Sequence, residues 1–180
     1  MAQAINTPYG TLAFPTLFEA RAVPGSNNEP RFSCTLIFDE AAQKKPEFKA
    51  LQDEILNAAN ERFPGNRGNH KALRMPIRKG EEKSEKYQGF DPGTVFISAW
   101  TKERPGLVDR NRNEILTKAE VWAGQLARIR VRPFAYDTSG NKGVGLMLEG
   151  VQIVKADMPR IDGRKSAAEV FTDIDDEDEV

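Results

Sequence analysis

The sequence predicts a mainly β fold: a small closed barrel of about five long strands, with one amphipathic helix after the second strand. Three observations predict it. Apolar and polar residues alternate in several long segments, turn residues separate those segments, and only one segment has helical spacing. About five long strands and one helix fit a small barrel better than a two-sheet sandwich.

The first two strands are predicted to form a hairpin. Residues 10–23 carry apolar side chains at even positions, and Pro15 interrupts the alternation, so we expect a long, bent strand. Turn residues fill 24–28, and the alternation resumes over 31–38. Cys34 lies on the apolar face of this second strand, which favours a small core residue over a reactive thiol.

A helix of about four turns is predicted over residues 48–63, where apolar side chains recur every three or four positions. Asp39 can cap the helical region, and Pro64-Gly65 ends it. Residues 64–93 have no sustained period and are rich in Gly, Pro, Lys and Glu, which predicts a long basic insertion. Phenylalanines on apolar faces are expected in the core: Phe14, Phe18, Phe32, Phe38, Phe48 and Phe63.

The second half of the chain predicts three further strands. They cover residues 94–102, residues 120–136 with a break at Gly124, and residues 144–154. A polar turn region precedes the second of these, and a Ser-Gly-Asn-Lys-Gly hairpin turn precedes the third. The apolar phase of the closing strand shifts across Gly150, as it does at a β-bulge.

Several classes of function are excluded by what the chain lacks. One cysteine and one histidine rule out an internal disulfide and a zinc site, and no motif indicates a cofactor. No nucleophile or phosphate-loop motif occurs, and the acidic residues of the body are scattered, so we expect no enzyme. No segment approaches a membrane span or an export signal, which predicts a cytoplasmic protein.

Charge is distributed unevenly along the chain. Residues 169–180 contain seven carboxylates and no cation, whereas residues 1–168 carry 26 basic and 20 acidic groups, a net of +6. We therefore expect a body over residues 1–162 that binds a polyanion and a flexible, disordered acidic tail over residues 163–180. The regulatory tail residues are Asp173, Asp175, Asp176, Glu177, Asp178 and Glu179.

Basic residues interleaved with aromatic ones indicate binding of a single-stranded nucleic acid. A strand period places Arg128, Arg130, Arg132, Phe134 and Tyr136 on one face, while Ile129 and Val131 enter the core. Cations follow phosphates and rings stack on bases whatever the sequence. The expected phosphate contacts are Lys71, Arg74, Arg78, Lys79, Lys102, Arg104, Arg110, Arg112, Arg128, Arg130, Arg132 and Lys142. The expected stacking residues are Tyr87, Trp100, Trp122, Phe134 and Tyr136.

Six short motifs occur in a fixed order along the chain: LRMPIRKG at 73–80, GF at 89–90, FISA at 96–99, PGLVD at 105–109, VWAG at 121–124 and GNKGV at 140–144. Together they resemble a family of tailed-phage proteins described as single-stranded-DNA-binding proteins. The resemblance covers residues 10–155.

The resemblance implies an OB-fold and sequence-independent coating of single-stranded DNA during phage replication or recombination in the bacterial host. It also implies an acidic tail that competes with DNA and contacts replication proteins, although this tail ends in Val180 where related tails often end in an aromatic residue. Homodimerisation and cooperative assembly on DNA stay open. Two alternatives remain: a strand-annealing recombination protein, and an OB-fold protein-interaction module whose tail mimics nucleic acid.

Overall fold

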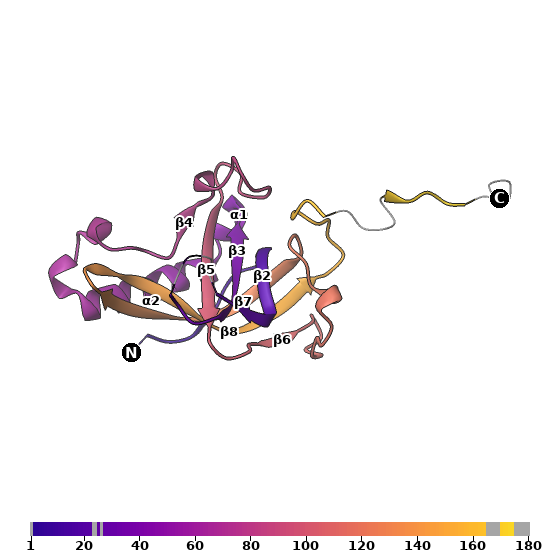
Figure 1. Ribbon diagram of the computed structural model, residues 1–180. Helices are drawn as coiled ribbons and strands as arrows, with labels where there is room; N and C mark the ends of the chain where they lie inside the picture. Colours follow the sequence, from indigo (N-terminus) through magenta and orange to yellow (C-terminus); the bar gives the residue numbers. More distant parts are fainter. Residues whose placement is uncertain (1, 23–24, 26, 165–169, 175–180) are drawn as a thin grey trace.

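The computed structural model describes residues 2–22, 25, 27–164 and 170–174, which form the mainly β arrangement in Figure 1. Its strands are β1 (Ile5–Asn6), β2 (Gly10–Arg21), β3 (Arg31–Phe38), β4 (Arg78–Lys79), β5 (Val95–Thr101), β6 (Gly106–Val108), β7 (Leu126–Thr138) and β8 (Asn141–Lys155). Its α-helices are α1 (Glu40–Gln43) and α2 (Pro46–Arg62).

Five of these strands close into a barrel. β3 pairs antiparallel with β2 and with β5, and β7 pairs antiparallel with β2 and with β8. A parallel pairing between β5 and β8, at Trp100 opposite Met147, completes the ring. A five-stranded barrel closed in this way is the OB-fold, so the predicted fold class is confirmed.

The interior of the barrel is filled by alternate residues from all five strands. Leu12, Leu36, Ile97, Ile129 and Leu146 are among the fully buried side chains. Cys34 lies in the same core, and burial raises the pKa of its thiol to about 12. Cys34 is therefore the inert core residue that the sequence predicted.

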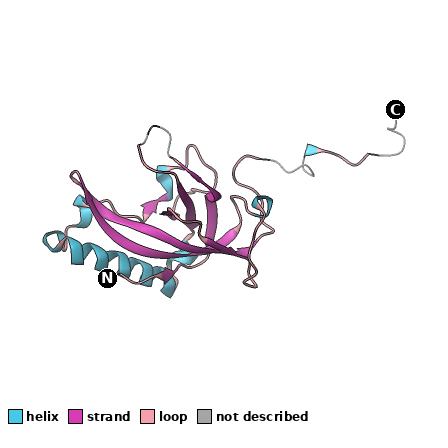
Figure 2. Cartoon of the chain, turned by 60° about the horizontal axis from the view of Figure 1, so that its bottom comes forward, coloured by secondary structure: helices cyan, strands magenta, loops and turns pink. Residues whose placement is uncertain are grey.

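Two helices occupy the region for which one helix was predicted. Asp39 caps the short helix α1, because its carboxylate Oδ1 accepts a hydrogen bond of 2.8 Å from the Ala42 N–H. The long helix α2 starts afresh with Pro46 in its first turn, a favoured place for proline. It packs against β1, β7 and β8, and Figure 2 shows it running alongside the long strands.

The insertion at residues 64–93 follows the barrel surface closely. It contains three 3-10 turns and the short strand β4, which pairs with β5. Phe90 is buried in a second, smaller core against the outer side of the barrel, together with Ala13, Ile37 and Phe96. The insertion is thereby held against β2, β3 and β5.

Three local predictions differ from the structure. The strand expected over residues 120–136 starts only at Leu126, because residues 118–120 form a 3-10 turn and Gly124 has a φ of 116°. Phe14 was expected in the core but is 43% exposed with a φ of 46°. Phe18 and Phe32 are only half-buried, whereas the other three predicted phenylalanines are buried.

The predicted bulge in the closing strand is present. Arg130 lies opposite Gly150 and Val131 lies opposite Leu148, which leaves Glu149 without a partner in the register. Among the described residues, no helix is long and apolar enough to cross a membrane.

Candidate nucleic-acid interface

Three aromatic rings form a row across the outer side of the barrel, here called the platform: Trp100 on β5 with Phe134 and Tyr136 on β7. The Trp100 and Phe134 ring centroids lie 5.8 Å apart, at 90°, and those of Phe134 and Tyr136 lie 6.3 Å apart. The guanidinium of Arg31, on β3, is 4.1 Å from the centroid of the Trp100 ring. Sequence reasoning proposed all three rings but missed Arg31.

Glycines on β8 make this arrangement of rings possible. Phe134 lies opposite Gly145 in the register, and a Cβ at Gly145 would come within 2.5 Å of the Phe134 ring. Gly143 stands in the same relation to Tyr136, whose hydroxyl oxygen would be 2.8 Å from an added Cβ. The two rings therefore lean across β8, which separates β7 from β5.

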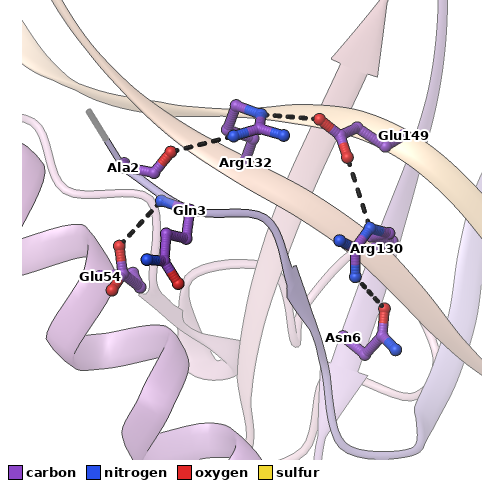
Figure 3. Close-up of polar contacts among 7 residues, drawn as sticks. All are labelled: Ala2, Gln3, Asn6, Glu54, Arg130, Arg132 and Glu149. Carbon is purple, nitrogen blue, oxygen red and sulfur yellow. Dashed lines mark hydrogen bonds and ion pairs between the residues drawn. The ribbon is translucent and has the colours of Figure 1, made fainter.

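The three arginines of β7 point outward as the strand period predicts, but each already has partners in the chain. Arg128 donates to Gln152 Oε1 at 2.7 Å. Arg130 and Arg132 share the carboxylate of Glu149, with nitrogen–oxygen distances of 3.5 and 2.8 Å (Figure 3). The bulge turns Glu149 toward this row, a consequence that sequence reasoning missed.

The N-terminal segment crosses the same row of arginines. Arg132 donates to the backbone oxygen of Ala2 at 3.1 Å, and Arg130 donates to Asn6 Oδ1 at 3.1 Å (Figure 3). The backbone N–H of Gln3 donates to Glu54 on α2 at 3.0 Å. This segment therefore links the arginine row to the long helix.

The other predicted cations are spread over several parts of the surface. Lys102 forms a 3.0 Å ion pair with Glu29 near the platform, and Arg78 on β4 forms a 2.8 Å ion pair with Glu82. Lys71, Arg74 and Lys79 are exposed along the insertion, and the backbone of Arg74 bonds to the β7–β8 hairpin that carries exposed Lys142. The guanidinium of Arg104 lies 5.3 Å from the Phe18 ring.

Arg110 and Arg112 are exposed in a turn that Asp109 organises. Asp109 Oδ1 accepts hydrogen bonds from the backbone N–H groups of Asn113 and Asn111, and these bonds lower the pKa of Asp109. Gln152 donates to the backbone oxygen of Asp109 at 3.2 Å, so it connects this turn to Arg128.

The remaining two predicted stacking residues, Tyr87 and Trp122, line a separate groove of about 790 Å³ beside β2. Its aromatic lining also includes Phe14 and Phe90. Among the described residues, its charged lining consists of Arg21, Lys86, Lys118, Arg160, Arg164 and one carboxylate, Asp162. The groove is thus both aromatic and cationic.

Of the predicted tail residues, only Asp173 lies within the described part of the chain; Asp175, Asp176, Glu177, Asp178 and Glu179 lie outside it. In Figure 1 the described tail segment 170–174 extends away from the barrel. Within the described residues, no group of three or more His, Cys, Asp or Glu side chains could hold a metal ion.

Solved structures of phage proteins share this fold. The single-stranded-DNA-binding protein of bacteriophage Enc34, in complex with single-stranded DNA, matches with a TM-score of 0.72 and 20% identity, covering 87% of this chain and 88% of that one. The single-stranded-DNA-binding protein gp2.5 of bacteriophage T7 matches with a TM-score of 0.63 and 16% identity, covering 91% and 98%.

Sequence comparison extends the similarity to nearly the whole chain. Protein p50 of Acyrthosiphon pisum secondary endosymbiont phage 1 is 29% identical over 172 residues, covering 91% of this chain and 89% of that protein. The family described as "Enterobacter phage Enc34, ssDNA-binding protein" matches residues 5–180. The chain therefore belongs to this family of phage single-stranded-DNA-binding proteins, whose function is DNA binding without catalysis.

Proposed function

We propose that this protein coats single-stranded DNA without sequence preference during phage replication or recombination, and that the platform holds the bases. The observation that carries the proposal is the row of Trp100, Phe134 and Tyr136 with Arg31 stacked at its end. The row lies on an outer face built by β3, β5, β7 and β8, and OB-folds commonly use the outer face of their second and third strands for oligonucleotides.

Ring surfaces favour unpaired bases over a duplex. Every base has a flat face that can stack on an aromatic ring, and each such contact is worth about 1–3 kcal/mol regardless of sequence. In a duplex those faces are already stacked on neighbouring bases. The Arg31 guanidinium is itself planar and cationic, so it extends the stacking surface and offers donors to a phosphate.

The cations around the platform supply the attraction to phosphate. Lys102 follows the end of β5 two residues after Trp100, Arg132 is two residues from Phe134 on β7, and Lys142 lies at the start of β8. Lys102 and Arg132 form ion pairs with Glu29 and Glu149, and exposed pairs of this kind are worth only about 0–1 kcal/mol. Exchanging a carboxylate for a DNA phosphate therefore costs little. We extend the proposal to the more distant predicted cations as secondary contacts.

The acidic tail completes the proposed function. A tethered polyanion has a high local concentration near the cationic body, so it should compete with DNA when DNA is scarce. When DNA displaces the tail, the tail becomes available to replication proteins of the host or phage. Competition and recruitment would then be two outcomes of one equilibrium.

The test is a fluorescence titration with oligothymidine, comparing the unaltered protein with Trp100→Ala and Phe134→Ala. Each variant should bind about 5- to 150-fold more weakly, which corresponds to the loss of one stacked base. Leu56→Ala is the control, because Leu56 lies on α2, is 37% exposed and belongs to neither the platform nor the groove.

Equal losses in all three variants would contradict the platform proposal. A protein-interaction module would show no DNA binding at all. A strand-annealing protein would bind and would also accelerate pairing of complementary oligonucleotides, which a mixed-strand assay detects.

A further inference from the structure

We propose that the groove beside β2 is a second contact site for the same single-stranded DNA, in which Phe14 and Tyr87 hold a base. The inference rests on the proposed function, because it assumes that the platform binds another part of the strand. It assigns a role to a residue, Phe14, that the strand pattern places in the core.

The backbone at Phe14 is strained in a way that the core does not explain. Its φ of 46° lies in the left-handed region, which a non-glycine residue rarely adopts, and Pro15 follows it although residues before proline prefer extended backbone. The strain coincides with a register shift in β2 between Ala13 and Thr16. Its result is an outward-facing ring, and strain of this kind is concentrated at functional sites.

The Phe14 ring and its neighbour stand on a rigid base. Phe14 and Tyr87 meet edge to face with centroids 4.9 Å apart, and 43% of each residue is exposed. Beneath them, Phe90 stacks against Phe14 at 6.0 Å and contacts Phe96 at 5.2 Å, and both lower rings are buried. Burial of the lower pair fixes the upper pair in place, so two ring surfaces are held ready without further ordering.

A cation accompanies the rings. Lys83 Nζ lies 5.7 Å from the Phe14 centroid and 5.5 Å from the Tyr87 centroid. It is therefore placed to meet the phosphate of a nucleotide whose base rests on either ring.

The opposite wall of the groove has the same chemistry. The Trp122 ring is held by a 2.9 Å hydrogen bond from its Nε1 to the Met158 oxygen, and the Arg160 guanidinium lies 5.1 Å from its centroid. In the described part of the chain, five cations and one carboxylate line the groove, and that carboxylate, Asp162, pairs with Arg160 at 3.7 Å. An aromatic lining with this surplus of positive charge fits a single-stranded polyanion that carries bases.

The outward side of β5 connects the two sites. Phe96, Ser98 and Trp100 alternate along it, with Phe96 under the groove rings and Trp100 in the platform. Phe96 and Trp100 are four residues apart, which is about 13 Å along a strand. Between them lies a small polar stretch where Thr35 and Ser98 share a 2.9 Å hydrogen bond. One DNA strand can therefore run from the platform to the groove.

Length dependence tests the inference, because a short oligonucleotide fills one site and a longer one fills both. Oligothymidines of about 5 and about 16 nucleotides span the usual range of OB-fold site sizes. Phe14→Ala and Tyr87→Ala should weaken binding of the longer one about 5- to 150-fold and leave the shorter one within about twofold. Trp100→Ala should weaken binding of both oligonucleotides, and the control Leu56→Ala should weaken neither.

Phe14→Gly guards against a folding defect, since glycine adopts the positive φ freely and still removes the ring. It should show the same dependence on length with an undiminished melting temperature. Equal losses at both lengths, or no loss at either, would overturn the groove as a DNA site. Tighter binding by the groove variants would also overturn it, because the groove would then hold the acidic tail. The platform and the groove fail in different ways. If Trp100→Ala binds the short oligonucleotide with full affinity while the groove variants still depend on length, the platform is refuted and the groove is not.

Discussion

Neutralising Glu149 should strengthen DNA binding. In Glu149→Gln the side chain keeps its shape but loses the charge that Arg130 and Arg132 now share at 3.5 and 2.8 Å. Only 28% of the Glu149 side chain is exposed, whereas the two arginine side chains are 49% and 42% exposed, so both cations stay accessible to phosphate. One additional phosphate contact should steepen the salt dependence of the binding constant by about 0.7 in the logarithmic slope.

The magnitude follows from the small value of exposed ion pairs. Such pairs contribute about 0–1 kcal/mol, so folding stability should fall by less than about 1 kcal/mol while affinity at low salt rises up to about fivefold. Oligothymidine titrations at two salt concentrations measure both quantities. Glu47→Gln in the first turn of α2 is the control, because it changes the net charge equally. If the salt dependence of binding is unchanged, or if binding weakens and the melting temperature falls, Arg130 and Arg132 serve only to anchor residues 2–6.

Three further predictions concern other parts of the molecule. A chain ending at Ala168 has a net charge of +6 and should bind oligothymidine more tightly than the full chain, with the largest difference at low salt. If the truncated and full chains bind equally well at both low and moderate salt, the tail does not compete with DNA. Gly145→Ala should displace the Phe134 ring and weaken binding about fivefold, with circular dichroism confirming the barrel; unchanged affinity would remove Phe134 from the site. Tryptophan emission should be quenched by oligothymidine, and tight binding without quenching would leave stacking to the tyrosines and phenylalanines.

Much of the fold follows from periodicity within single segments. Alternation along β7 is a local property, so the sequence was sufficient to place Ile129 inward and Arg130 outward. The same holds for the bulge near Gly150, where the apolar phase changes within one strand. The charge of the tail is likewise a matter of composition.

Contacts within the platform could be predicted only where a single strand supplies both residues. Phe134 and Tyr136 are two residues apart on β7, so a period of two brings them together. Arg31 and Trp100 come from different strands, and their contact depends on the β3–β5 register, which no local pattern contains. Phe14 was assigned to the core because alternation predicts which face of a regular strand a side chain occupies. At the register shift in β2, the left-handed backbone of Phe14 turns its side chain to the opposite face.

The sequence by itself determined the five long strands of the barrel, the helical region, the outward face of β7 and the contrast in charge between residues 1–168 and the acidic tail, because these depend on neighbours along the chain. Tertiary structure alone decided that Glu149 pairs with two arginines and that segments 86–90, 118–123 and 160–164 meet around one groove. Closure of the barrel brings these distant segments together. The pairings of β7 with β2 and of β5 with β8 decide which parts of its surface become neighbours.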